Sequence, residues 1–74
     1  NPSSDCVRIS LTTPHNIKFD IEIFDSFGRR IGFKNNIQSN EEILFEKEMF
    51  NNGINLIKIN FNGEFLCTKK VFIE

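Results

Sequence analysis

The sequence predicts an all-β domain, an antiparallel β-sandwich of six or seven short strands. The first reason is composition: eleven Ile and nine Phe occur without any Ala, Trp or Tyr, and β-branched and aromatic side chains fit a pleated, half-buried surface. The second reason is the alternation of apolar and polar residues in several segments. The third is the turn signals, which separate these segments at intervals of roughly eight to twelve residues.

Length and charge restrict the class of protein. Seventy-four residues suffice for one domain and leave no room for a separate catalytic one. The formal net charge of −1 argues against nucleic acid or an anionic membrane as the partner, because both attract clustered positive charge. No apolar run approaches the ~20 residues of a membrane-spanning helix. The chain opens without a secretory signal peptide, so it is either cytoplasmic or preceded by an export signal.

The first two strands are expected at residues 6–12 and 17–24. Pro14 follows the first strand and ends it, because proline cannot donate a hydrogen bond to a ladder. The second strand has the clearest alternation, with a charged face opposite an apolar one. The apolar side chains expected to point inward are Val7, Ile9 and Leu11 in the first strand, and Ile17, Phe19, Ile21 and Ile23 in the second.

A tight turn is expected after the second strand. Gly28 is the natural residue for a positive φ in the run Asp25-Ser26-Phe27-Gly28, and Asp25 is expected to accept backbone hydrogen bonds there. Residues 30–34 would return as a third strand with Ile31 and Phe33 inward. Residues 35–42 are polar and are expected to form an exposed loop.

The segment that follows has two possible structures. Residues 39–42 resemble a helix-capping box, so a helix could run to Met49. Ile43, Phe45 and Lys47 alternate with Leu44 and Glu46, however, as in a strand. We favour the short strand.

The last two strands form a predicted hairpin. Residues 51–53 are a turn, residues 54–61 a strand, and Asn62-Gly63 indicates a type I′ turn. This loop pairs Phe61 with Glu64, Ile59 with Leu66, and Ile57 with Thr68. Cys67 then lies opposite Lys58 on the more polar face, unless a bulge intervenes. The hairpin ends with residues 69–74.

No group of residues indicates catalysis, and no metal or other cofactor is expected. His15 is the single histidine, and with Cys6 and Cys67 it does not provide the local four-ligand spacing of a zinc site. Asp20 and Glu22 share a strand face that is expected to be solvated. Two cysteines are no disulfide framework, so we expect two thiols.

Three phenylalanines could serve recognition instead of the core. Phe24, Phe27 and Phe72 would form a contact patch if they fell outside the core. In a chain with nine Phe, core packing is the expected arrangement.

In order along the chain, these motifs resemble one family. The segments are NPSSD, VRISL, IEIFDSFGRRI, NNGINLIKI, FNG and TKKVFI, and together they resemble the type A C-terminal sorting domain of type IX secretion cargo. The resemblance covers essentially the whole chain. The matching positions are Asn1, Pro2, Asp5, Gly28, Arg29, Gly53 and Lys70. Asn55 departs from the pattern, since the family usually has an aromatic residue there, and so does Glu74, where many relatives end in Lys.

The resemblance implies an immunoglobulin-like sandwich formed by residues 1–74 at the C-terminus of a larger exported protein. Such domains occur in Bacteroidetes, and the cargo passes through the periplasm before it is secreted or held at the cell surface. The implied partners are the outer-membrane translocon, its shuttle proteins, a surface sortase and the upstream passenger. The sortase would cleave before Asn1, and the cargo can be joined to anionic lipopolysaccharide.

We therefore expect a non-catalytic sorting signal that docks the translocon through exposed strand edges or its final strand. The residues expected to make contact are Gly28, Arg29, Lys69, Lys70, Val71, Phe72, Ile73 and Glu74. The alternative is an accessory module of the same architecture that binds carbohydrate or protein for an adjacent enzyme. A carbohydrate platform usually presents Trp or Tyr for stacking, and this chain has neither.

Overall fold

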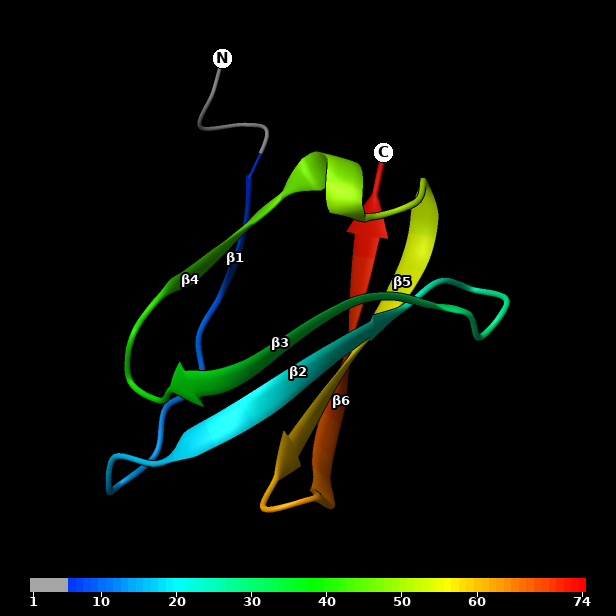
Figure 1. The fold of residues 1–74 in the computed structure, drawn as a ribbon. Coiled ribbons are helices and arrows are strands. Elements are labelled where there is room, and N and C mark those ends of the chain that lie inside the picture. The colour runs from blue at the N-terminus through cyan, green and yellow to red at the C-terminus, as the bar shows by residue number, and fades with distance from the viewer. Residues whose placement is uncertain (1–5) are drawn as a thin grey trace.

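The computed structural model describes residues 6–74, and within them it confirms the all-β prediction. The strands are β1 (Cys6–Ile9), β2 (Lys18–Phe24), β3 (Arg30–Gln38), β4 (Ile43–Glu46), β5 (Gly53–Phe61) and β6 (Glu64–Ile73), with a short 3₁₀ helix, η2 (Lys47–Met49), between β4 and β5. β1 and β4 form one antiparallel sheet. The other four form an antiparallel sheet in the order β3-β2-β5-β6 (Figure 1). Asn1, Pro2 and Asp5 lie outside the described residues.

The core lies between the two sheets and follows the predicted alternation most closely in β2. Phe19, Ile21 and Ile23 are buried there. They pack with Ile57 and Ile59 of β5 in one apolar cluster. β1 ends three residues earlier than expected, at Ile9, but Leu11 beyond it still packs against the core.

The predicted inward orientation of Phe33 in β3 is wrong. Ile23 pairs with Gly32, and Phe24 pairs with Arg30, so the intervening Ile31 is an extra residue in a β-bulge. The bulge shifts the alternation by one position, because it adds one residue to one strand only. Ile31 packs against the core as predicted, whereas Phe33 is exposed and lies opposite Glu22.

The loop predicted for residues 35–42 is also wrong in its first half. β3 continues to Gln38, and Ile37 is buried in the core. A second bulge accommodates the polar run: Asn36 has a φ of 54°, a left-handed conformation that Asn tolerates better than most residues. The Asn36 N–H donates to Asp20 Oδ1 at 3.1 Å.

The structure confirms the strand favoured for residues 43–46 over the alternative helix. Phe45 is buried from this strand, and its ring meets that of Phe50 edge to face, with centroids 6.3 Å apart. Lys47 does not continue the strand as expected, since it begins η2. This 3₁₀ turn brings Phe50 back to the core.

The β5–β6 hairpin has the predicted turn but a different register. Asn62 and Gly63 have φ values of 53° and 78°, as a type I′ turn requires, and Phe61 pairs with Glu64. The expected pairs Ile59–Leu66 and Ile57–Thr68 are wrong.

A bulge at Leu66 causes this difference. Asn60 pairs with Phe65 and Ile59 with Cys67, so Leu66 is the extra residue. Cys67 therefore turns to the inner face and packs against the core, instead of lying opposite Lys58. No disulfide joins Cys6 and Cys67.

Core packing was the wrong expectation for Phe27 and Phe72, which are 82% and 68% exposed. Phe24 is half-buried and is not part of the buried cluster. None of the helices in residues 6–74 is both long enough and apolar enough to cross a membrane.

Candidate functional site

The β2–β3 turn is held together by one buried carboxylate. The Gly28 N–H donates to the Asp25 carbonyl at 3.0 Å, and Gly28 has a φ of 84°. Asp25 is 1% exposed. Its Oδ1 accepts from the N–H groups of Phe27 and Arg29, each at 2.9 Å. Its Oδ2 accepts from Arg29 Nε at 2.7 Å. The predicted structural role of Asp25 is confirmed, because its side chain binds the backbone of its own turn.

The same contacts set the charge state of Asp25. Burial raises the pKa of a carboxyl group by disfavouring its charged form. At Asp25 the hydrogen bonds from Arg29 and Phe27, together with the charge of Arg29, outweigh burial and lower the pKa below its ordinary value of 3.8. Asp25 is therefore an anion at neutral pH, which makes its hydrogen bonds charge-assisted.

Asn55 holds the turn before β5 in a similar way. Its side chain is fully buried, although it lies in a strand whose other buried side chains are apolar. Asn55 Nδ2 donates to the carbonyls of Asn51 at 2.8 Å and Gly53 at 3.3 Å. Its Oδ1 accepts from the Asn51 N–H at 3.2 Å. Gly53 takes a φ of 92° in this turn, which is the conformation that favours glycine.

Asn51 joins the two turns. Its Nδ2 donates to Asp25 Oδ2 at 3.4 Å, while its backbone is bound by Asn55. We call this connected set of Asp25, Arg29, Asn51 and Asn55 the corner network. It brings the adjacent Gly28 and Arg29 to the same end of the four-stranded sheet as Gly53, which lies far from them in the sequence.

The C-terminal end of β6 lies at this same end. Gly53 pairs with Ile73 and Ile54 with Phe72, and Figure 1 shows the end of β6 beside the start of β5. Successive residues of β6 point to opposite faces of the sheet. Lys70 and Phe72 are on the outer face, where Phe72 lies beside Ile54. Ile73 is buried in the core.

The comparisons with known proteins decide the family. The family described as the secretion system C-terminal sorting domain matches residues 1–74, the whole chain. The chain belongs to this family. Its members are C-terminal signals of type IX secretion, so the predicted resemblance is confirmed. No curated protein and no solved structure matches the chain.

Four of the positions expected from the resemblance to match the family fall in the described part of the sorting domain. Gly28, Arg29 and Gly53 lie at the corner network, and Lys70 lies on the neighbouring outer face of β6. At Asn55, where the resemblance leads us to expect an aromatic residue in relatives, the side chain binds three backbone groups. The sequence patterns do not predict these roles of Asn51 and Asn55. The available signal was an amide in the inward stripe that continues with Ile57 and Ile59.

The predicted contact residues at the end of the chain do not share one surface. Lys70, Phe72 and Glu74 are exposed, Val71 is half-buried and Ile73 belongs to the core. Lys69 is exposed but pairs with Ile57 on the inner face. The structure brings only Lys70 and Phe72 to the outer face at the corner network.

Glu22 contacts several polar and charged side chains on the outer face of the four-stranded sheet. Arg30 Nη1 lies 3.2 Å from Glu22 Oε2, and Asn60 Nδ2 donates to Glu22 Oε1 at 3.0 Å. Burial raises the pKa of this carboxyl, but the hydrogen bonds from Arg30 and Asn60 and the nearby charge of Lys58 outweigh it, so the pKa lies below the ordinary 4.5.

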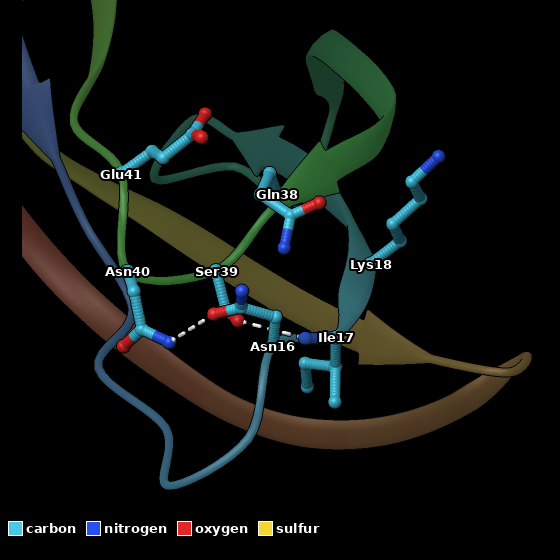
Figure 2. A pocket seen from close by; sticks show the side chains of 7 residues that line it. All are labelled: Asn16, Ile17, Lys18, Gln38, Ser39, Asn40 and Glu41. Carbon is cyan, nitrogen blue, oxygen red and sulfur yellow. Dashed lines mark hydrogen bonds between the residues drawn. The ribbon is translucent and has the colours of Figure 1, made fainter.

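A polar hollow lies at the opposite end of β2. It has a volume of about 550 Å³, and Figure 2 shows the side chains that line it. Ser39 Oγ accepts from the Ile17 N–H at 2.9 Å, and Asn40 Nδ2 donates to Asn16 Oδ1 at 2.8 Å. These polar groups bind one another across the hollow. No aromatic side chain lines it, so it lacks the stacking surface of a typical carbohydrate site.

Asp20 and Glu22 lie on one face of β2, and His15 precedes that strand. Asp20 and Glu22 each bind their own partners, Asn36 and Arg30. His15 is exposed in the turn before β2. Within residues 6–74, no cluster of three or more His, Cys, Asp or Glu side chains is placed to hold a metal ion.

Proposed function

We propose that residues 1–74 form the single C-terminal domain of a larger exported protein, and that the type IX machinery recognises this domain as a folded unit. The signal would direct an upstream passenger from the periplasm across the outer membrane, assisted by shuttle proteins. A surface sortase would then remove the domain by cleavage before Asn1. The passenger would be released or held at the surface of a Gram-negative bacterium. The domain itself would perform no catalysis.

The corner network is the observation that carries the proposal. It fixes Gly28, Arg29 and Gly53 with hydrogen bonds that do not depend on a partner. A recognition surface that is rigid before binding loses less conformational entropy when its partner binds. We therefore infer that Gly28, Arg29 and Gly53 keep this end of the domain in a fixed shape before a partner binds.

Exposed side chains around the network are of the kind that dominates protein interfaces. Phe27 and Phe72 are exposed aromatics, and the Arg29 guanidinium lies 5.4 Å from the centroid of the Phe27 ring. Aromatic and arginine side chains are enriched among residues that carry binding energy. We propose that Gly28, Arg29, Lys70 and Phe72 lie in the contact with the translocon, and that the edge of β6 adds main-chain pairing.

A reporter fusion tests this function. A periplasm-targeted reporter followed by residues 1–74 is expressed in a host with a working type IX system, and surface and periplasmic fractions are compared. Phe72→Ser and Lys70→Glu are expected to reduce surface reporter by at least about tenfold, because each weakens a central contact. Lys18→Glu, at the opposite end of β2, is the matched control and should leave export unchanged.

Two outcomes would contradict the proposal. Periplasmic retention of the intact fusion would show that the domain is not a sufficient signal. Full export of Phe72→Ser, Lys70→Glu and a deletion of residues 71–74 would exclude the terminal strand. Specific binding on a glycan array would instead favour the accessory-module alternative.

A further inference from the structure

Within the described residues, the two sheets of the sandwich differ in width, which leaves half-buried apolar side chains at one margin of the core open to solvent. The sheet of β1 and β4 has two strands, whereas the sheet it covers has four. On the β6 side, a groove of about 310 Å³ lies between residues 8–11 and the inner faces of β5 and β6. Ile57 and Ile59 lie at its base, with Cys67 and Val71 half-buried beside them. We call this space the β1–β6 groove.

Both walls of the β1–β6 groove offer backbone hydrogen-bonding groups. Within residues 6–74, β1 pairs with β4 alone, so its other edge has no strand partner. In the described part of the chain, β6 is the last strand of the larger sheet and is paired only with β5. An unpaired strand edge presents a row of N–H and C=O groups that an extended segment can bind. An added strand would therefore extend the smaller sheet across the open part of the core.

The positive charge around the β1–β6 groove favours an acidic partner over a second copy of the chain. Arg8 and Lys69 line it, and none of its lining residues in the described range 6–74 is acidic. Arg8 has one exposed ion pair, with Glu42 at 3.8 Å, while Lys69 forms no ion pair within residues 6–74. A second copy adding its β6 strand would bring Lys69 and Lys70 toward the same lysines of the first copy, and like charges opposite each other destabilise a strand pair.

We propose that the β1–β6 groove accepts one extended strand of a partner protein, in which apolar and acidic side chains alternate. The strand pairs with the open edge of β1. Its apolar side chains cover the half-buried Leu11, Cys67 and Val71. Its acidic side chains, on the opposite face of the strand, pair with Arg8, and the exposed Lys69 side chain reaches them from the edge strand β6. The assignment of this partner to the export machinery rests on the proposed function, whereas the groove and its chemistry do not.

A designed peptide tests the groove directly. The probe is an acetylated peptide of about eight residues alternating Val and Glu, a usual length for one strand. Control peptides have Val and Lys in alternation, or all Val before all Glu. Binding to the 74-residue chain is followed by fluorescence anisotropy of labelled peptide. In a Cys6→Ser background, Cys67 alkylation reports whether the groove itself is filled.

The expected result is saturable binding of the Val–Glu peptide with a Kd below about 1 mM, together with slower alkylation of Cys67. Neither control peptide should do either. Lys69→Glu should weaken this binding by about tenfold or more. Lys70→Glu should change it less than about twofold, because Lys70 follows Lys69 in the same strand but points to the outer face. This pair of variants matches charge, strand and exposure, and differs in the face of the sheet.

Several outcomes would overturn the inference. Absence of Val–Glu binding, equal binding of Val–Lys, or equal loss in Lys69→Glu and Lys70→Glu would each do so. Cys67 protection that rises with protein concentration would assign the groove to a second copy. Protection that disappears when residues 1–5 are deleted would assign it to the chain itself. Normal export of the reporter fusion alongside any of these results would leave the proposed sorting function intact.

Discussion

Asp25 and Arg29 form an ion pair in which one partner is buried and the other is exposed. The Arg29 Nε atom lies 2.7 Å from Asp25 Oδ2, yet the Arg29 side chain is 70% exposed while that of Asp25 is 1% exposed. The arginine therefore satisfies the buried carboxylate and still presents its guanidinium to solvent. Because the Arg29 side chain is largely exposed, solvent screens its charge, so the backbone hydrogen bonds that Asp25 accepts are the larger part of its structural role.

Replacing Asp25 with Asn should destabilise the domain although size is preserved. The Asn side chain can still accept the two backbone hydrogen bonds through its oxygen. Its amide donor would face Arg29 Nε and Asn51 Nδ2, which are also donors. We expect the Tm to fall by about 5–10 °C, measured by circular dichroism. Asp20→Asn, which preserves the acceptor for a single backbone N–H, is the control; an equal fall there would contradict the role of the corner network.

The lowered pKa values predict loss of stability in acid. Asp25 and Glu22 have folded pKa values below their ordinary values of 3.8 and 4.5. Each group therefore stabilises the fold fully above its unfolded pKa, and this contribution is lost as the pH falls through the folded pKa. The free energy of unfolding, measured with urea, should begin to decrease below about pH 4.5. Asp25→Asn should reduce this slope; an unchanged slope would show that other groups cause it.

Asn55 should tolerate an apolar replacement poorly, despite its place in an apolar stripe. Leu has the same branched shape but is larger and cannot bind Asn51 or the Gly53 carbonyl, and buried backbone groups without partners are costly. We expect Asn55→Leu to lower the free energy of unfolding by about 2–4 kcal/mol. Asn52→Leu, in the exposed part of the same turn, should change it by less than about 0.5 kcal/mol. Similar losses in both variants would contradict this.

Substitution of an exposed phenylalanine should destabilise the domain much less than substitution of a buried one. Phe45→Ala removes a buried ring in contact with Phe50 and should cost about 3–5 kcal/mol, enough to unfold a domain of this size. Phe27→Ser and Phe72→Ser should each cost less than about 1 kcal/mol, since both rings are already in water. Urea titrations decide the point. Unfolding of either Ser variant would contradict the exposed position of that ring and indicate that it packs in the core.

The sequence was most informative where a strand has no irregularity. The alternation of Phe19, Ile21 and Ile23 identifies the buried face of β2 directly, because the side-chain period of a strand is two. Asn62 and Gly63 likewise identify their own turn. Both features are determined by the residues of the strand or turn itself, so they can be predicted without knowing the rest of the fold.

The bulges could not be located in the same way. Ile31 and Leu66 are each the extra residue of a bulge, and nothing in their local sequence marks them as unpaired. Which residue bulges depends on how the strand fits its neighbour and the core, which is a tertiary effect. One extra residue reverses the face of every later side chain, which explains the errors at Phe33 and Cys67.

The hydrogen bonds of the buried Asn55 could not be predicted from the sequence for a related reason. Its position in the alternation indicated an inward side chain, but its partners are the backbone of Asn51 and Gly53. Those partners come into place only when the turn closes. The end of the sheet at which Gly28 and Gly53 meet could therefore not be derived from the sequence alone.

The Leu66 bulge gives a last prediction that distinguishes the two registers of the β5–β6 hairpin. Lys58 pairs with Thr68 on the outer face, while Cys67 points inward opposite Ile59. In a Cys6→Ser, Cys67→Ser background, Lys58→Cys with Thr68→Cys should form a disulfide under mild oxidation, because directly opposite strand residues have suitable spacing. Lys58→Cys beside the native Cys67 should not, because the two sulfur atoms would lie on opposite faces. Mass spectrometry of the oxidised, unreduced proteins reads out both results. A bridge in the second variant would restore the unbulged register and place Cys67 outside the β1–β6 groove.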